Sequence, residues 1–284
     1  MDKKLGVLGG SGLYEMEGLK NIKTHKVSTP FGDPSDEYIS GQLEDGTTLF
    51  FLPRHGKGHR FLPSEINYRA NIYGFKKLGV EWLLSASAVG SMKEEIEPGH
   101  MVVPDQFIDR TFRRASTFFG EGIVAHVPFG DPVCAQLRTL IVEASKSIGA
   151  KTHDKGTYVC MEGPQFSTRA ESVSYRQLGV SVIGMTNMPE AKLAREAEIS
   201  YATLALSTDY DCWHEGHDDV TADAVMEVMQ KNVVMAKKII KTVALNLSNQ
   251  PSPYRGLLKT SIVTDRSTIP QATREKLKLL LNES

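Results

Sequence analysis

Short apolar runs that end in glycine or small polar residues constrain the fold of this chain more than any other feature of its sequence. Leu5–Leu8 ends at a glycine loop, Trp82–Val89 is a near-continuous run of apolar and small residues, and Ile199–Thr208 leads into an acidic segment. Such runs are typical of parallel strands buried on both faces. Helical patterns stand between and beyond them, as in Val133–Ile148 and Ala222–Leu247. The alternation predicts an α/β fold with a central mixed, mostly parallel sheet flanked by helices.

The remaining elements fit the same fold. Further strands are expected at Tyr38–Gln42, Thr48–Leu52, Met101–Val103, Gly156–Met161 and Val180–Gly184, and further helices at Pro63–Leu78, Ala170–Leu178 and Glu190–Ala197. The chain has 284 residues without an internal repeat or a low-complexity linker. We therefore predict one domain over residues 1–284. A break at Ser248–Tyr254, which carries two prolines, leaves residues 255–284 as a C-terminal tail with a helix near Gln271–Leu281.

The charge balance and the cysteines narrow the class of protein. There are 33 lysine and arginine residues against 34 acidic ones, so nothing favours a nucleic acid or an anionic membrane as partner. No apolar run approaches the roughly 20 residues that span a bilayer. Cys134, Cys160 and Cys212 are far apart and odd in number, which predicts neither a disulfide framework nor a zinc site. We expect a cytoplasmic protein with reduced thiols and no bound metal.

A glycine loop follows the first predicted strand. Gly9-Gly10-Ser11-Gly12 can turn tightly and present backbone N–H groups to an anion. A dinucleotide-binding fingerprint needs a further glycine where this chain has Glu15, and the Gly-Lys-Ser/Thr of an ATP-binding loop is absent. The loop is therefore a candidate phosphate site of another type, and a plain strand-ending turn is the alternative.

Two further strand ends carry polar or small residues. Arg54 follows a strand and could hold a phosphate with its planar fork of donors, although a solvated basic turn is an alternative. His55 and His59 are four residues apart, but the glycines between them argue against a metal-binding helix. The small residues of Ser85–Ser91 leave room for a ligand where a strand becomes a loop, or else allow close packing with helices.

Two later segments could contact a flat heterocycle. Phe166 follows Glu-Gly-Pro and could stack on a base, or be a core aromatic. Asp209 and Asp211 share one face if the strand continues to them. Their carboxylates could bind Mg²⁺ or face the nitrogens of a base, and a helix-capping aspartate beside a solvated one is the alternative.

Together these segments resemble the trimeric purine nucleoside phosphorylase and methylthioadenosine phosphorylase family over roughly residues 5–247. The glycine loop, Arg-His-Gly, Ala-x-Gly-Ser, Glu-Gly-Pro-x-Phe, Met-Thr-x-x-Pro-Glu and Thr-Asp-Tyr-Asp occur in the family's order. The branch that acts on 6-oxopurines places asparagine at Asp209 and glutamate at Ser167, so this chain is more similar to the methylthioadenosine branch. Val225, where related enzymes that read a 5′-hydroxyl carry a histidine, favours the same branch.

The resemblance implies a role for each matching residue. Phosphate would be held by Ser11, Arg54, His55, Ser87, Ala88 and Thr186. The ribose and base would contact Met185, Phe166, Asp209 and Asp211. The 5′-methylthio pocket would be formed by Ala222, Val225, Met226 and, from a neighbouring subunit of a homotrimer, His126. The resemblance implies no cofactor. Inorganic phosphate takes part in the reaction as a co-substrate.

The implied reaction is phosphorolysis of methylthioadenosine to adenine and 5-methylthioribose 1-phosphate. Phosphate is the nucleophile, and Asp209 is the acid at purine N7. Alternatives are a phosphorylase for inosine or guanosine, a nucleosidase that uses water, and a non-catalytic nucleotide-binding protein on the same fold. Retention of both Arg54 and Asp209 disfavours the last of these.

Overall fold

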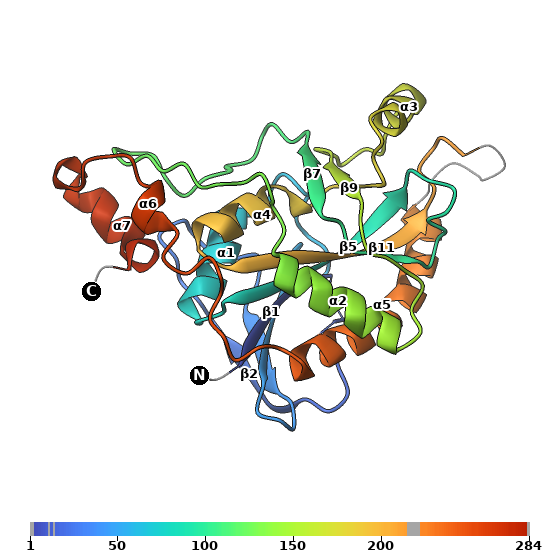
Figure 1. The fold of residues 1–284 in the computed structure, drawn as a ribbon, viewed down its shortest axis with the longest axis horizontal. Coiled ribbons are helices and arrows are strands. Elements are labelled where there is room, and N and C mark those ends of the chain that lie inside the picture. Colours follow the sequence, from blue (N-terminus) through green and yellow to red (C-terminus); the bar gives the residue numbers. More distant parts are fainter. Residues whose placement is uncertain (1–2, 11, 14, 215–221, 283–284) are drawn as a thin grey trace.

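A single twisted sheet with helices on both sides forms the body of the protein (Figure 1). The computed structural model describes residues 3–10, 12–13, 15–214 and 222–282, with only the backbone described for residues 222–224. The strands are β1 (Lys4–Gly9), β2 (Lys20–His25), β3 (Tyr38–Gln42), β4 (Thr48–Pro53), β5 (Trp82–Ser91), β6 (Met101–Val102), β7 (Gln106–Asp109), β8 (Thr152–His153), β9 (Thr157–Cys160), β10 (Val182–Gly184) and β11 (Ser200–Asp209). The helices are α1 (Tyr68–Lys77), α2 (Ala135–Ser147), α3 (Arg169–Gln177), α4 (Asn187–Glu196), α5 (Ala222–Leu245), α6 (Leu258–Ser261) and α7 (Gln271–Leu281), with a 3-10 turn at Arg266–Thr268.

Strand β5 is the centre of the sheet. It pairs in parallel with β1 on one side and with β11 on the other, and its last residues pair with the antiparallel β10. β4 is parallel to β1, and β9 is parallel to β10. The predicted fold class, a mixed and mostly parallel sheet flanked by helices in a single domain, is confirmed.

The two faces of β5 are buried against different helices. Leu83 and Val89 pack in one core cluster with residues of α1 and α4. Trp82, Leu84 and Ala86 alternate with them and pack in a second cluster with residues of α2 and α5. A strand covered on both faces can be apolar at every position, which explains the continuous apolar run in the sequence.

Some elements differ from their predicted positions. α1 begins at Tyr68 rather than Pro63, because the Asn67 side chain caps it by accepting a hydrogen bond from the Ala70 N–H. β2, β7 and β8 were not predicted: Lys20–His25 lies mostly exposed and lacks an apolar run, and β8 is only two residues long. α7 occupies Gln271–Leu281 as predicted.

The C-terminal segment packs on a long connection between β7 and α2. Residues 112–130 (green in Figure 1) extend from the body beside α6 and α7. Backbone hydrogen bonds join the two segments, from the His126 N–H to the Ser261 carbonyl (2.8 Å) and from the Val263 N–H to the Val124 carbonyl (3.0 Å). The boundary of the tail at residue 255 stays a prediction.

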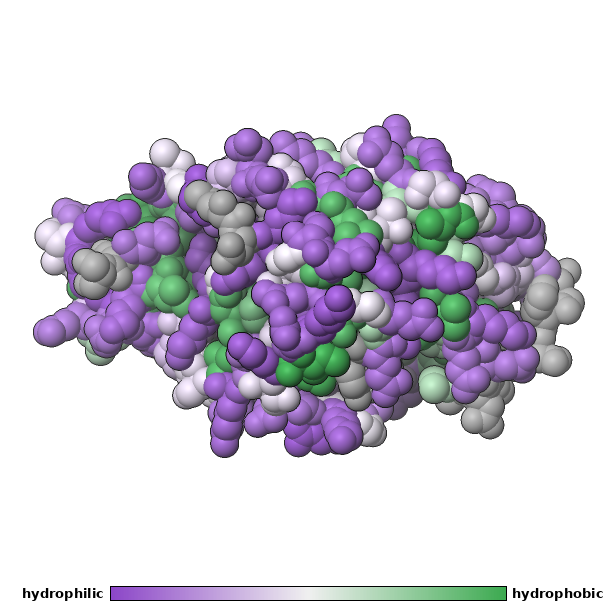
Figure 2. Space-filling model, turned by 90° about the horizontal axis from the view of Figure 1, so that it is seen from below, coloured by the Kyte–Doolittle hydropathy of each residue, from purple (hydrophilic) through white to green (hydrophobic). Residues whose placement is uncertain are grey.

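Hydrophilic residues cover most of the face in Figure 2, and hydrophobic residues gather in small patches on the part of it that is described. Among the described residues, no helix is long and apolar enough to cross a membrane.

Candidate active site

The carboxyl ends of β1, β4, β5 and β11 meet at one edge of the sheet, because these strands run in the same direction. The N–H of Arg54, just after β4, donates to the carbonyl of Gly9 at the end of β1 (2.9 Å). Asp209 at the end of β11 lies opposite Gly90 of β5. Ligands of open α/β sheets bind at this edge.

Arg54 is almost completely buried, with 2% of its surface exposed. Its guanidinium forms an ion pair with the buried Glu190 and donates to the Ser85 hydroxyl (2.6 Å) and the Ala86 carbonyl (3.1 Å). Burial acts to lower the pKa of Arg54, but the Glu190 carboxylate outweighs burial and raises it. Arg54 is therefore a fixed positive charge at the strand ends.

Three hydroxyl groups lie together next to this charge. Ser87 Oγ is 3.1 Å from Thr186 Oγ1 and 3.3 Å from the Tyr158 hydroxyl. Thr186 reaches Ser87 because β10 runs antiparallel to the end of β5, so the residues after β10 return beside it. Ala88 follows Ser87 and is half-buried. The fold thus brings Arg54, Ser87, Ala88 and Thr186 together, whereas Ser11 lies outside the described residues.

His55 is held as a neutral imidazole. Its Nδ1 is 2.8 Å from the Phe61 carbonyl oxygen, which only accepts, so Nδ1 carries the proton. Burial lowers the pKa of His55 to about 4. The ring also stacks on His59, with 4.1 Å between centroids. Nε2 of His55 is therefore a hydrogen bond acceptor at neutral pH.

Asp209 and Asp211 differ in their hydrogen bonding. Asp209 Oδ2 accepts from the Thr208 hydroxyl (2.7 Å), and its Oδ1 accepts from the Asp211 N–H (2.8 Å). Burial raises the pKa of Asp209. A Cβ atom on Gly90 would lie 2.8 Å from Asp209 Oδ1, so only glycine allows this approach. Asp211 Oδ2 is buried without a hydrogen bond partner in the described part of the chain, as a group awaiting a donor would be.

The turn that carries Phe166, between β9 and α3, lies beside the loop that carries Asp211 after β11. Phe166 is 47% exposed, so it is not a core aromatic. The Cys212 thiol donates to the Ser167 carbonyl (3.4 Å), and Arg169 donates to the Cys212 carbonyl (2.8 Å). These contacts join the turn before α3 to the loop after β11.

The predicted 5′ pocket is only partly assembled in one chain. On α5, Val225 is half-buried and Met226 is 57% exposed, and the Ala222 side chain is outside the description. His126 is exposed on the segment beside α6, at the end of the molecule away from the start of α5 (Figure 1). A single chain does not bring His126 to α5.

Sequence reasoning missed several residues of this region. Tyr158 and Glu190 contact the predicted phosphate residues, and Glu190 lies in the Met-Thr-x-x-Pro-Glu motif, which was a usable signal. Arg114 is buried among the backbone carbonyls behind the Phe166 turn and had no sequence signal. No group of three or more histidine, cysteine, aspartate or glutamate side chains in the described residues is arranged to hold a metal ion.

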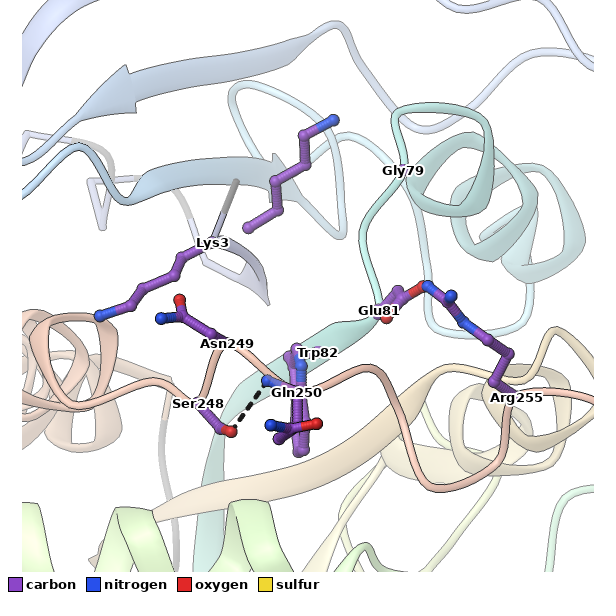
Figure 3. A pocket seen from close by; sticks show the side chains of 9 residues that line it. Lys3, Gly79, Glu81, Trp82, Ser248, Asn249, Gln250 and Arg255 are labelled. Atoms are coloured by element: carbon purple, nitrogen blue, oxygen red, sulfur yellow. Dashed lines mark hydrogen bonds and ion pairs between the residues drawn. The ribbon is translucent and has the colours of Figure 1, made fainter. Parts of the chain in front are cut away.

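A cavity of about 260 Å³ lies at the opposite edge of the sheet (Figure 3). It is lined by the start of β1 with the residue before it (Lys3 and Lys4), the start of β5 with the residue before it (Glu81 and Trp82), the segment after α5 (Ser248–Gln250) and Arg255. The cations have partners in the protein: Arg255 pairs with Glu81, and Lys4 donates to the Leu78 carbonyl (3.0 Å). This cavity is separate from the strand ends that carry Asp209.

Comparison with known proteins agrees with this geometry. Residues 4–244 match the family model of the phosphorylase superfamily. An S-methyl-5′-thioadenosine phosphorylase from Geobacter sulfurreducens is 59% identical and covers 99% of both chains, and one from Koribacter versatilis is 53% identical over 100% of this chain and 97% of its own.

Solved structures give the same result. A methylthioadenosine phosphorylase from an Antarctic soil metagenomic library has a TM-score of 0.93 and 49% identity, with 98% of this chain and 99% of that chain covered. The Schistosoma mansoni methylthioadenosine phosphorylase in complex with adenine has a TM-score of 0.86 and 35% identity, with 92% and 99% covered. The chain belongs to the phosphorylase superfamily and, within it, to the family of the S-methyl-5′-thioadenosine phosphorylases.

Proposed function

We propose that this enzyme catalyses phosphorolysis of S-methyl-5′-thioadenosine, releasing adenine and 5-methylthioribose 1-phosphate. The observation that carries the proposal is that a buried positive charge, Arg54, and a half-buried carboxyl group of raised pKa, Asp209, lie at the same edge of the sheet. Arg54 with the Ser87 and Thr186 hydroxyls suits a phosphate dianion, and Asp209 suits a proton donor.

The phosphate is bound by Arg54, Ser87, Thr186, the Ala88 N–H and Ser11. His55 completes this set in a specific way. Its Nε2 accepts a hydrogen bond, so it contacts the O–H of hydrogen phosphate rather than an unprotonated oxygen. A neutral His55 thereby orients the nucleophile without adding a second positive charge beside Arg54.

The nucleoside lies between this phosphate and the aspartates. Phe166 packs on the base and the Met185 backbone contacts the ribose hydroxyls. Asp209 gives its proton to N7 as the C1′–N9 bond breaks, and Asp211 Oδ2 accepts from the 6-amino group. A phosphate oxygen forms the new bond to C1′ with inversion. Adenine gains the proton of Asp209, hydrogen phosphate releases one to solvent, and Asp209 regains one from solvent, so the reaction balances. General acid assistance of this kind contributes roughly 10²–10⁴ in rate.

The 5′-methylthio group lies against Ala222, Val225 and Met226 on α5. Val225 is apolar, which suits a thioether better than a hydroxyl. We propose a homotrimer in which His126 of each subunit reaches the neighbouring site, because its exposed segment lies far from α5 of its own chain. The enzyme works in the cytoplasm, binds no nucleic acid and needs no cofactor, since phosphate is a co-substrate that is consumed.

One assay tests this function against its rivals. Purified enzyme is incubated with methylthioadenosine with and without phosphate, and the sugar product is identified by mass. Adenine release that requires phosphate and yields 5-methylthioribose 1-phosphate supports the proposal. Release without phosphate would identify a nucleosidase, and faster turnover of inosine or guanosine would identify a 6-oxopurine enzyme. No turnover of any nucleoside would leave a binding protein.

A further inference from the structure

Arg114 is a buried arginine that the proposed chemistry does not use. Its side chain has no exposed surface, and all five of its N–H groups have acceptors in this chain. Nη1 donates to the carbonyls of Met185 (2.7 Å) and Met188 (2.6 Å), and Nη2 donates to those of Glu162 (2.8 Å) and Met161 (3.4 Å). Nε donates to the Glu162 carboxylate (3.2 Å). No donor remains for a ligand, so Arg114 cannot act by touching substrate.

Three of the four carbonyls belong to the two connections that carry the nucleoside contacts, and the fourth, of Met188, lies in the first turn of α4. Met161 and Glu162 directly precede the turn that presents Phe166. Met185 is the predicted ribose contact itself, and its carbonyl shares a peptide plane with the Thr186 N–H. A buried carbonyl without a donor costs free energy, so both connections would shift to regain hydrogen bonds if the guanidinium were lost.

The guanidinium is itself locked in place through Glu162. This carboxylate also accepts from the Ser64 hydroxyl and from the backbone N–H groups of Phe112 (2.6 Å) and Arg113 (3.2 Å). Burial acts to raise the pKa of Glu162, but these hydrogen bonds and the Arg114 charge outweigh burial and lower it. Arg114 and Glu162 thus form a charged pair, and two separate parts of the chain, Ser64 and residues 112–113, hold its carboxylate in place.

We infer that Arg114 is a positioning residue that sets the affinity for the nucleoside by holding the Met185 carbonyl and the turn before Phe166 in register. This inference rests on the proposed function. The phosphate side has side-chain support of its own, because Arg54 is held by Glu190 and Ser85 and the Thr186 hydroxyl lies against the Ser87 hydroxyl, none of which contacts Arg114. Loss of Arg114 should therefore weaken binding of the nucleoside much more than binding of phosphate.

Arg114→Lys tests the inference. A lysine keeps the charge, but its ammonium carries three donors on one atom and cannot span both connections as the planar fork does. We expect KM for methylthioadenosine to rise at least about tenfold, with KM for phosphate changing less than about threefold. Arg113→Lys is the matched control. Its exposed side chain is changed while its N–H bond to Glu162 remains, so both constants should stay at wild-type values.

A merely structural role would lower the thermal midpoint and the active fraction without separating the two constants. Equal rises in both KM values, or no rise in either, would overturn the inference. Should Arg114→Lys fail to fold, Glu162→Gln weakens the same clamp while keeping a carbonyl acceptor, and a smaller rise in the nucleoside KM alone is expected. Calorimetric titration of wild type and variants with methylthioadenosine, without phosphate, reads the affinity directly. If wild type bound the nucleoside without turning it over, the proposed function would fail, but this titration would still decide the role of Arg114.

Discussion

Replacing Asp209 with asparagine removes the transferable proton and leaves the shape of the site almost unchanged. In the free enzyme, Oδ1 accepts from the Asp211 N–H and Oδ2 accepts from the Thr208 hydroxyl. An asparagine can keep its oxygen on the N–H and turn its amide nitrogen toward Thr208, because a hydroxyl can accept as well as donate. We therefore expect Asp209→Asn to fold with wild-type stability within about 1 kcal/mol.

The expected loss is in turnover. A general acid contributes roughly 10²–10⁴ in rate, which corresponds to about 3 to 5 kcal/mol of activation free energy. Burial raises the pKa of Asp209, so the wild-type rate should fall as the pH rises through this raised value and the acid loses its proton. The asparagine variant should lack that alkaline limb. It should also turn over 6-oxopurine nucleosides better relative to methylthioadenosine, because an amide can accept from a base that carries a proton at N7.

The assay follows adenine release from methylthioadenosine at saturating phosphate between pH 5 and pH 9, with inosine as the second substrate. Asp154→Asn is the matched control, since it makes the same change in an exposed residue whose carboxylate forms a solvent-exposed ion pair with Lys146. An Asp209→Asn enzyme with unchanged kcat and an unchanged alkaline limb would refute the assignment of Asp209 as the acid.

Two further predictions concern other parts of the chain. Val225→His should narrow the preference for methylthioadenosine over adenosine in competition assays, because it places a polar ring in the proposed apolar pocket for the 5′ group; an unchanged ratio would contradict that pocket. Glu196 is buried, and burial raises its pKa to about 7, although hydrogen bonds from Phe118 and Thr117 act to lower it. Its folded pKa exceeds the unfolded value of 4.5, so its stabilising contribution is complete at low pH and is lost as the pH rises through 7. In urea unfolding, wild type should lose about 2 to 3 kcal/mol more than Glu196→Gln between pH 5 and pH 8, and equal losses would contradict the shift.

The parts of the fold that could be predicted are those whose pattern is local. β5 and β11 are runs of apolar and small residues that are buried along almost their whole length, and α7 combines helical spacing with good helix-forming residues. β2 and β8 escaped prediction because their strand conformation is imposed by neighbours rather than by their own residues. β2 pairs with β3 through backbone groups while its side chains stay mostly in solvent, and β8 is a two-residue pairing with β6.

The candidate site also contains residues that the local sequence predicts and residues that it does not. Arg54 and Asp209 each follow an apolar run and Ser87 lies near the end of another, so a search of the strand ends finds them. Arg114 could not be found by that search, because most of its partners are backbone carbonyls, which have no side-chain signature. Met185 and Met188, two of these partners, lie more than 70 residues away in the sequence.

The two buried arginines, Arg54 and Arg114, differ in the N–H donors that they have left for a ligand. This difference explains why Arg54 can bind a ligand whereas Arg114 only supports the site. Every N–H of Arg114 has an acceptor within the chain. Arg54 uses its Nε and Nη2 groups on Glu190, Ser85 and the Leu8 carbonyl, but within the described residues Nη1 donates only to the Ala86 carbonyl. One of its N–H groups thus remains for a ligand at the edge where Ser87 and Thr186 lie. Glu190 fixes the orientation of the Arg54 guanidinium and neutralises part of its charge. The free N–H of Nη1 therefore points in one direction. This favours binding of an oxyanion in a defined position, in line for attack, over a loosely held counter-ion.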